Sequence, residues 1–127
     1  MKVRRPSKSI EPALKVLVAG SIDWDDQITI RSSLSIFPKT SKIVHTGSRG
    51  ACALVDLEVR RLGFGRVEVV LARFQEYGID APMWRNIEIV DLIRPDFAVI
   101  FLMSRNPSLD DLIARLEPAN IPAWIVD

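Results

Sequence analysis

Lys42-Ile43-Val44-His45-Thr46-Gly47-Ser48-Arg49-Gly50-Ala51 joins a predicted strand to a predicted helix. The strand covers residues 42–46, and its apolar run ends at a turn rich in small residues. The helix covers residues 52–62, where Val55 and Val59 share one face, and Gly63 suits its C-terminal cap. This order predicts one strand–turn–helix unit, which is the building block of a parallel sheet.

The same alternation extends along the whole chain. Short apolar runs predict strands over residues 14–19, 42–46, 67–71, 96–102 and 122–126. Helical patterns lie between them over residues 25–37, 52–62, 82–94 and 107–116, and residues 72–81 are expected to form a loop. We therefore predict an α/β protein with a three-layer, Rossmann-like, doubly wound and mostly parallel five-stranded sheet. The first strand should be central.

Composition allows one small domain and few classes of partner. The chain has 127 residues, 48% of them hydrophobic, and a net charge of +1, which offers no electrostatic case for nucleic acid or a membrane surface. We expect a flexible basic tail over residues 1–13 and a single domain over residues 14–127. Cys52 is the only cysteine, so no internal disulfide or cysteine-based metal cluster is expected. Without a signal peptide or membrane-length apolar run, the cytoplasm is the default compartment.

Ligands of doubly wound sheets bind at the carboxyl ends of the strands, so the loops after the strands are the candidate sites. In the second of these loops, Gly47, Ser48 and Gly50 allow close approach of the backbone, and Arg49 adds a planar donor fork for phosphate or carboxylate. The pattern predicts an anion site. The alternative is an ordinary strand-to-helix turn with a surface arginine.

The first loop repeats this chemistry. Gly20 permits a tight turn, and the hydroxyl of Ser21 can contact a phosphate. Asp23 or Asp25 can cap the following helix. Trp24 packs as a staple against Ile28 or offers a flat face to a base. The pattern G-x-G-x-x-G and the Walker lysine are both absent, so NAD or FAD in the usual pose is not expected.

Two further residues have a structural and a chemical interpretation. His45 ends the second strand and is interpreted as a structural histidine rather than an acid or base. Cys52 lies in the first helical turn near Arg49, where a thiolate is favoured, although a buried inert cysteine is the commoner case. No nucleophile–base–orienter set is identifiable.

Several short motifs follow the predicted strands: Gly20-Ser21-x-Asp23-Trp24, His45-x-Gly47-x-Arg49-Gly50-Ala51, Tyr77-Gly78 and Arg85-Asn86. In their order and spacing they resemble the YspA/YpsA-related branch of the SLOG superfamily. The resemblance covers residues 15–101 and continues more weakly to the end. It implies a small Rossmann-like protein that senses or processes nucleotide-derived ligands, similar to DprA and to the cytokinin-activating phosphoribohydrolases. It also implies that Arg85 reaches the same crevice as Arg49.

Departures from this family pattern bear on catalysis. The branch usually has an aspartate where Cys52 stands, and Asp56 lies one helical turn later. The family tends to carry a glycine-rich, phosphate-cradling turn after the fourth strand, where residues 103–108 contain no glycine. The absence of this aspartate and of the glycine-rich turn weakens a prediction of catalysis more than a prediction of binding.

The resulting prediction is a cytoplasmic sensor or accessory protein that binds a nucleotide-derived or other phosphate-bearing small ligand at the carboxyl edge of the sheet. The alternatives are an N-glycosidic hydrolase of nucleoside monophosphates and a degenerate fold that acts as a protein-interaction module. No cofactor, metal, nucleic acid or membrane is expected as a partner, and the oligomeric state stays open. The predicted ligand-binding residues are Gly20, Ser21, Asp23, Trp24, Gly47, Ser48, Arg49, Gly50, Tyr77, Arg85 and Asn86.

Overall fold

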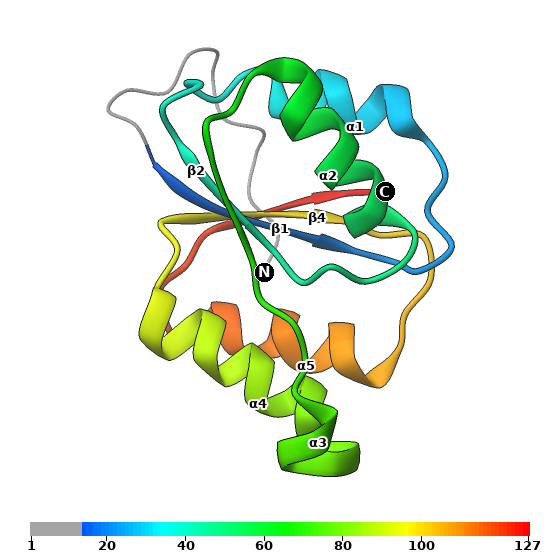
Figure 1. Cartoon of the computed structure of the whole chain (residues 1–127), viewed down its shortest axis with the longest axis vertical. Coiled ribbons are helices and arrows are strands. Elements are labelled where there is room, and N and C mark those ends of the chain that lie inside the picture. The colour runs from blue at the N-terminus through cyan, green and yellow to red at the C-terminus, as the bar shows by residue number, and fades with distance from the viewer. Residues whose placement is uncertain (1–13) are drawn as a thin grey trace.

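The computed structural model describes residues 14–127, so the predicted basic tail lies outside the described residues. Its centre is a five-stranded sheet in the order β3-β2-β1-β4-β5, and every neighbouring pair is parallel (Figure 1). The predicted fold class and the central place of β1 are confirmed. The strands are β1 (Lys15–Gly20), β2 (Lys42–His45), β3 (Arg66–Val69), β4 (Phe97–Phe101) and β5 (Ala123–Val126).

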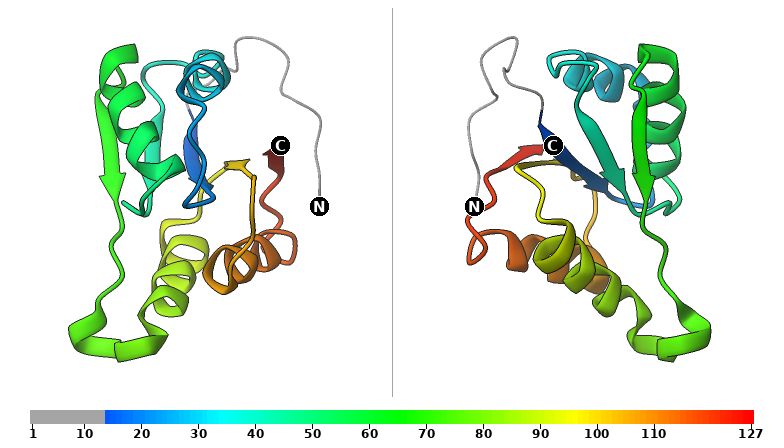
Figure 2. Two further views of the ribbon diagram at one scale, coloured as in Figure 1. Left: turned by 90° about the vertical axis from the view of Figure 1, so that its right-hand side faces the viewer. Right: turned by 60° about the vertical axis from the view of Figure 1, so that its left-hand side comes forward.

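Helices cover both faces of the sheet. One face carries α1 (Gln27–Leu34) and α2 (Ala51–Leu62). The other carries α4 (Ala81–Ile87), its π-helical continuation η2 (Glu88–Ile93), and α5 (Pro107–Leu116). The short helix α3 (Phe74–Tyr77) and the 3₁₀ turn η1 (Gly78–Asp80) project away from the sheet, as Figure 2 shows.

The core is divided by the sheet into two apolar clusters. Val16 and Val18 of β1 pack toward α1 and α2, whereas Leu17 and Ala19 pack toward α4 and α5. All four are buried, because successive side chains of a strand point to opposite faces and both faces are covered. This explains why β1 and β4 are continuous apolar runs in the sequence.

Two local predictions are wrong. Residues 72–81 are not a plain loop, because α3 and η1 lie within them. The helix predicted over residues 25–37 covers only Gln27–Leu34, and Asp26, rather than Asp23 or Asp25, caps its start. The carboxylate of Asp26 accepts hydrogen bonds from the backbone N–H of Thr29 at 3.0 Å and from its hydroxyl at 2.6 Å. Among residues 14–127, no helix is long and apolar enough to span a membrane.

Candidate ligand-binding site

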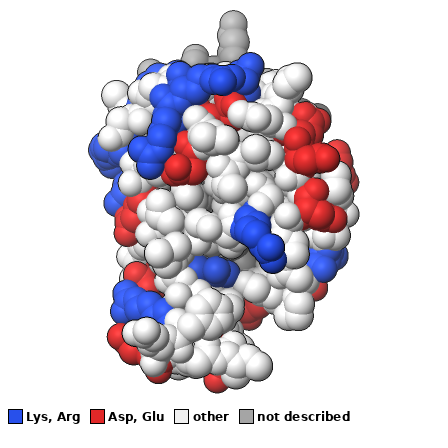
Figure 3. Space-filling model, turned by 45° about the vertical axis from the view of Figure 1, so that its right-hand side comes forward, with Lys and Arg blue, Asp and Glu red and all other residues white. Residues whose placement is uncertain are grey.

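A cavity of about 440 Å³ opens at the carboxyl edge of the sheet, on the face covered by α4 and α5. It lies near the point where the winding direction reverses, which is where doubly wound sheets bind ligands. Figure 3 brings this edge forward; its middle is mostly uncharged and carries basic groups, while acidic groups lie mainly toward the margins. The lining residues are Ala19, Gly20, Ile22, Thr46, Gly47, Ser48, Leu71, Ala72, Phe74, Pro82, Arg85, Asn106, Ser108, Leu109 and Leu112.

The loop after β2 forms one wall of this cavity. Gly47 has φ +72°, a conformation that favours glycine, and a side chain there would also meet Leu71 at 2.7 Å. Its N–H donates to Nδ1 of His45 at 3.1 Å. The hydroxyls of Thr46 and Ser48 lie 2.8 Å apart. The loop therefore has a fixed path and presents small polar groups to the cavity.

Arg85 forms the cationic part of the wall. Its Nη2 donates to Oγ of Ser108 at 2.7 Å and to Oδ1 of Asn86 at 3.3 Å, while its Nε is buried without a hydrogen-bond partner. Within residues 14–127 no carboxylate pairs with Arg85, and every other arginine is either exposed or paired with a carboxylate. Burial lowers the pKa of this guanidinium from its ordinary value. Arg85 is thus a partly buried cation with unused donors.

Asn86 has a structural role beside Arg85. It is fully buried, and its Nδ2 donates to the backbone oxygen of Ser108 at 2.9 Å and to Oδ2 of Asp111 at 3.0 Å. Both amide protons are therefore used in holding α4 to α5. We infer that Asn86 positions Arg85 and Ser108; a direct contact to ligand stays a prediction from the sequence.

The loop after β1 is largely occupied with its own fold. Oγ of Ser21 accepts from the backbone N–H groups of Met103 and Ser104 and donates to the backbone oxygen of Ser104 at 2.5 Å. Asp23 accepts from Oγ of Ser104 at 2.8 Å. Gly20 lines the cavity, and a side chain there would meet the backbone oxygen of Phe101 at 2.5 Å. These contacts join the loops after β1 and β4.

Trp24 lies in the core rather than at the cavity. Its side chain is only 6% exposed, its ring centroid lies 5.3 Å from that of Phe101, and its Nε1 donates to the backbone oxygen of Asp26. The predicted staple against Ile28 is not formed, because Ile28 is exposed. The ring also has little free surface to offer a base in this conformation.

Gly50 and Arg49 differ in their surroundings. Gly50 has φ +71°, and a side chain there would lie 2.3 Å from the backbone oxygen of Ile22. This glycine lets the start of α2 pack closely on the first loop, where Ala51 N–H donates to the backbone oxygen of Ser21 at 3.1 Å. Arg49 is exposed and does not line the cavity.

Tyr77 lines a second cavity of about 320 Å³, which shares Leu71 and Arg85 with the first. Its ring stacks on that of Trp84, with centroids 5.3 Å apart. Trp84, one residue before Arg85 in α4, has a half-exposed side chain. Its position directly before Arg85 is the one sequence feature that could have drawn attention to it. Ser108, which orients Arg85, was also missed, and no motif marked it.

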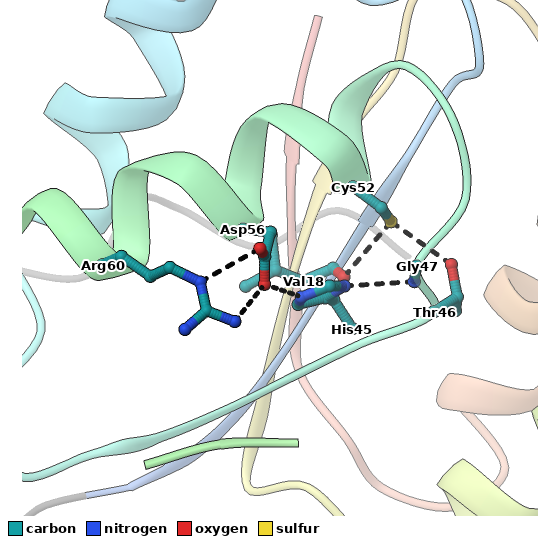
Figure 4. A network of polar contacts seen from close by, with 7 residues as sticks. All are labelled: Val18, His45, Thr46, Gly47, Cys52, Asp56 and Arg60. Atoms are coloured by element: carbon teal, nitrogen blue, oxygen red, sulfur yellow. Dashed lines mark hydrogen bonds and ion pairs between the residues drawn. The ribbon is translucent and has the colours of Figure 1, made fainter. Parts of the chain in front are cut away.

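The structural interpretation of His45 fits its contacts (Figure 4). Nδ1 accepts from Gly47, so Nε2 carries the proton and donates to Oδ1 of Asp56 at 3.1 Å. Burial lowers the pKa of His45, although the neighbouring Asp56 opposes the shift. Arg60 in turn holds the pKa of Asp56 below its ordinary value. The ring is therefore a neutral support for the Gly47 loop.

Cys52 is buried, with its Sγ 3.3 Å from Oγ1 of Thr46 and 3.9 Å from the backbone oxygen of Val18.

Together the groups that line the first cavity suit the binding of an anion that has an apolar part. One guanidinium, several hydroxyls and apolar side chains face the cavity, and its described lining includes no Asp, Glu, His or Cys. Asp110, near the start of α5, is paired with Arg105 at 2.6 Å and does not line the cavity.

Gly20, Gly47, Ser48 and Arg85 are therefore brought together at the first cavity, and Tyr77 lies beside it. Ser21, Asp23, Trp24, Arg49, Gly50 and Asn86 are not among its lining residues. Comparison with protein families, with curated proteins and with solved structures gave no match to this chain.

Proposed function

We propose that this protein binds a small, phosphate-bearing molecule in the cavity between the Gly47–Ser48 loop and Arg85, as a sensor or accessory protein. The observation that carries the proposal is Arg85: a partly buried guanidinium with an unpartnered Nε and no carboxylate partner in residues 14–127. A buried charge without a partner is unfavourable, and an anionic ligand would supply that partner.

Two features support phosphate as the anionic group. The guanidinium fork matches phosphate oxygens, and Ser48 and Ser108 place hydroxyl donors in the same lining. The resemblance to the SLOG superfamily supports a nucleotide-derived molecule as the carrier of that phosphate. Hydrolysis of the ligand is not part of the proposal, because the described lining offers no acid or base.

The test is a calorimetric titration with inorganic phosphate, ribose 5-phosphate and adenosine 5′-monophosphate. We expect at least one of these probes to bind, and Arg85→Ala to weaken it by roughly 10- to 100-fold, the usual effect of losing hydrogen bonds to a charged group. Arg66→Ala is the matched control, because Arg66 is exposed on β3 and does not line the cavity. Equal affinities in both variants and the parent protein would contradict the proposal.

A thermal-shift measurement extends this test to other ligands. A ligand at about 100 times its Kd should stabilise the protein by roughly 2.7 kcal/mol. Arg49→Ala belongs in the same series, because the sequence predicts a role for Arg49 in anion binding. With Arg49 outside the cavity, we expect this variant to bind more tightly than Arg85→Ala.

A further inference from the structure

Exposed apolar side chains are concentrated in residues 70–93, which run from the end of β3 through α3, η1, α4 and η2. Most of the large exposed apolar residues of the described chain belong to this segment, although exposed apolar residues elsewhere on the molecule are scattered. Leu71, Tyr77, Trp84 and Leu92 line the second cavity together, and an exposed apolar surface usually marks an interaction site. The large exposed apolar residues of this segment are Leu71, Phe74, Tyr77, Ile79, Met83, Trp84 and Leu92.

The second cavity hollows this surface beside the proposed phosphate site. Tyr77 and Trp84 form an aromatic wall, with ring planes inclined by only 25°. Trp84 is 48% exposed and Tyr77 is 39% exposed, so the pair retains free ring surface. Arg85 and Leu71 line both cavities, so the aromatic pair lies next to the proposed phosphate site.

Exposed aromatic faces attract other flat rings, and tryptophan offers the largest such face. Arg73 and Glu88 add polar groups to the same lining, and they pair with each other at 3.4 Å. A donor and an acceptor at the margin suit the polar edge of a heteroaromatic ring.

We propose that the second cavity is a subsite for a flat aromatic or heteroaromatic ring, which belongs to the same molecule whose phosphate pairs with Arg85. This inference rests on the proposed function and deepens it, because it assigns the ring of the ligand to a cavity of its own, lined by Tyr77 and Trp84. Trp84 is the main stacking residue, and Tyr77 supports its ring from the other side. Self-association of the chain through the same surface is the rival explanation.

The test compares probes that differ in one part. Adenosine 5′-monophosphate carries both ring and phosphate, ribose 5-phosphate lacks the ring, and adenosine lacks the phosphate. We expect the monophosphate to bind roughly tenfold or more tightly than ribose 5-phosphate, as a stacking contribution of ordinary size requires. We also expect it to change the fluorescence of Trp84.

Variants then separate the two subsites. Trp84→Leu should reduce the affinity for the monophosphate to that for ribose 5-phosphate, while ribose 5-phosphate binding stays unchanged. Trp84→Phe should keep most of the affinity and lose the fluorescence change. Ile79→Ala is the matched control, because Ile79 is 92% exposed and lies outside this cavity. Circular dichroism of each variant verifies that the fold is retained.

The outcomes distinguish this inference from the proposed function. Ribose 5-phosphate binding that depends on Arg85, with no gain from the ring or no effect of Trp84→Leu, would overturn the ring subsite and leave the phosphate site standing. Absence of binding by every phosphate probe would overturn both. Concentration-dependent dimerisation in sedimentation, abolished by Trp84→Leu, would assign the surface to a second copy and overturn the inference.

Discussion

The two faces of the sheet use their polar residues in opposite ways. Between α1 and α2, the buried carboxylate of Glu58 accepts hydrogen bonds from Arg31 at 2.8 Å and from Gln27 at 2.6 Å. On the other face, the partly buried Arg85 of α4 has no carboxylate partner within residues 14–127 and borders two cavities. The first face is a satisfied structural core, and the second retains unused binding capacity. Motif residues that lie at the same edge of the sheet can therefore have different roles.

Removal of the Trp24 side chain should give the largest loss of stability on the face of the sheet that α1 and α2 cover. We expect Trp24→Ala to lower the free energy of unfolding by about 3–5 kcal/mol, because the ring is buried against Phe101. Trp84→Ala, on the other face, should cost about 1 kcal/mol or less, because that ring is half exposed. Urea unfolding measures both values. Equal losses would remove the distinction between the faces.

A substitution at Gly50 tests the close packing of the first two loops. We expect Gly50→Ala to cost about 2–4 kcal/mol, because it adds strain at φ +71° and a clash with the backbone of Ile22. Gly65→Ala is the control, since a side chain there meets no atom within 4 Å. Its unfolding free energy should change by less than about 0.5 kcal/mol. A tolerated Gly50→Ala would indicate that the loops are not packed as described.

Loss of the Glu58 carboxylate, which accepts hydrogen bonds between α1 and α2, should give a smaller loss of stability. Glu58→Gln should lower the free energy of unfolding by about 1–3 kcal/mol, because hydrogen bonds to a charged carboxylate are lost. Glu117→Gln is a control at an exposed helix end. Chemical denaturation at pH 7 compares the two. A neutral effect of Glu58→Gln would show that this carboxylate contributes little to the pairing of α1 with α2.

The smallest expected effect is the pH dependence of His45. Its pKa is lowered in the folded state, chiefly by burial, so the unfolded chain binds a proton more readily as the pH falls below about 6.5. Stability should therefore decrease from pH 7 toward pH 5.5, by at most about 1.4 kcal/mol per pH unit. His45 is the only histidine of the chain, so His45→Gln should abolish this slope. A slope that persists in the variant would assign it to another group.

Much of the fold was predictable from the sequence, because apolar runs and turn residues fix the alternation of strands and helices. The first strand ends at Gly20 and proved central, as expected. The helical content of residues 72–81 was not predictable, since its apolar side chains point outward and leave no buried stripe. The helix start at Gln27 depends on which of three neighbouring aspartates caps the helix, and the sequence does not distinguish Asp26 from Asp23 and Asp25.

The candidate site was predictable only in part. Gly47, Ser48 and Arg85 follow from local pattern and resemblance, and all three line the cavity. Sequence alone could not show that Ser21 is occupied by the loop after β4, because residues more than eighty positions apart make that contact. Nor could it show that Arg85 has no carboxylate partner within residues 14–127, which depends on how α4 packs against α5.

Amide chemical-shift mapping by NMR tests the central claim most directly, with adenosine 5′-monophosphate added to the uniformly labelled protein. The claim is that the ligand lies between the loop after β2 and α4, on the face covered by α4 and α5. We predict saturable shifts at Gly47, Ser48, Arg85 and Ser108, and small shifts along α1. Shifts confined to residues 23–34, with Arg85 and Ser108 unmoved, would place binding on the opposite face and contradict the account.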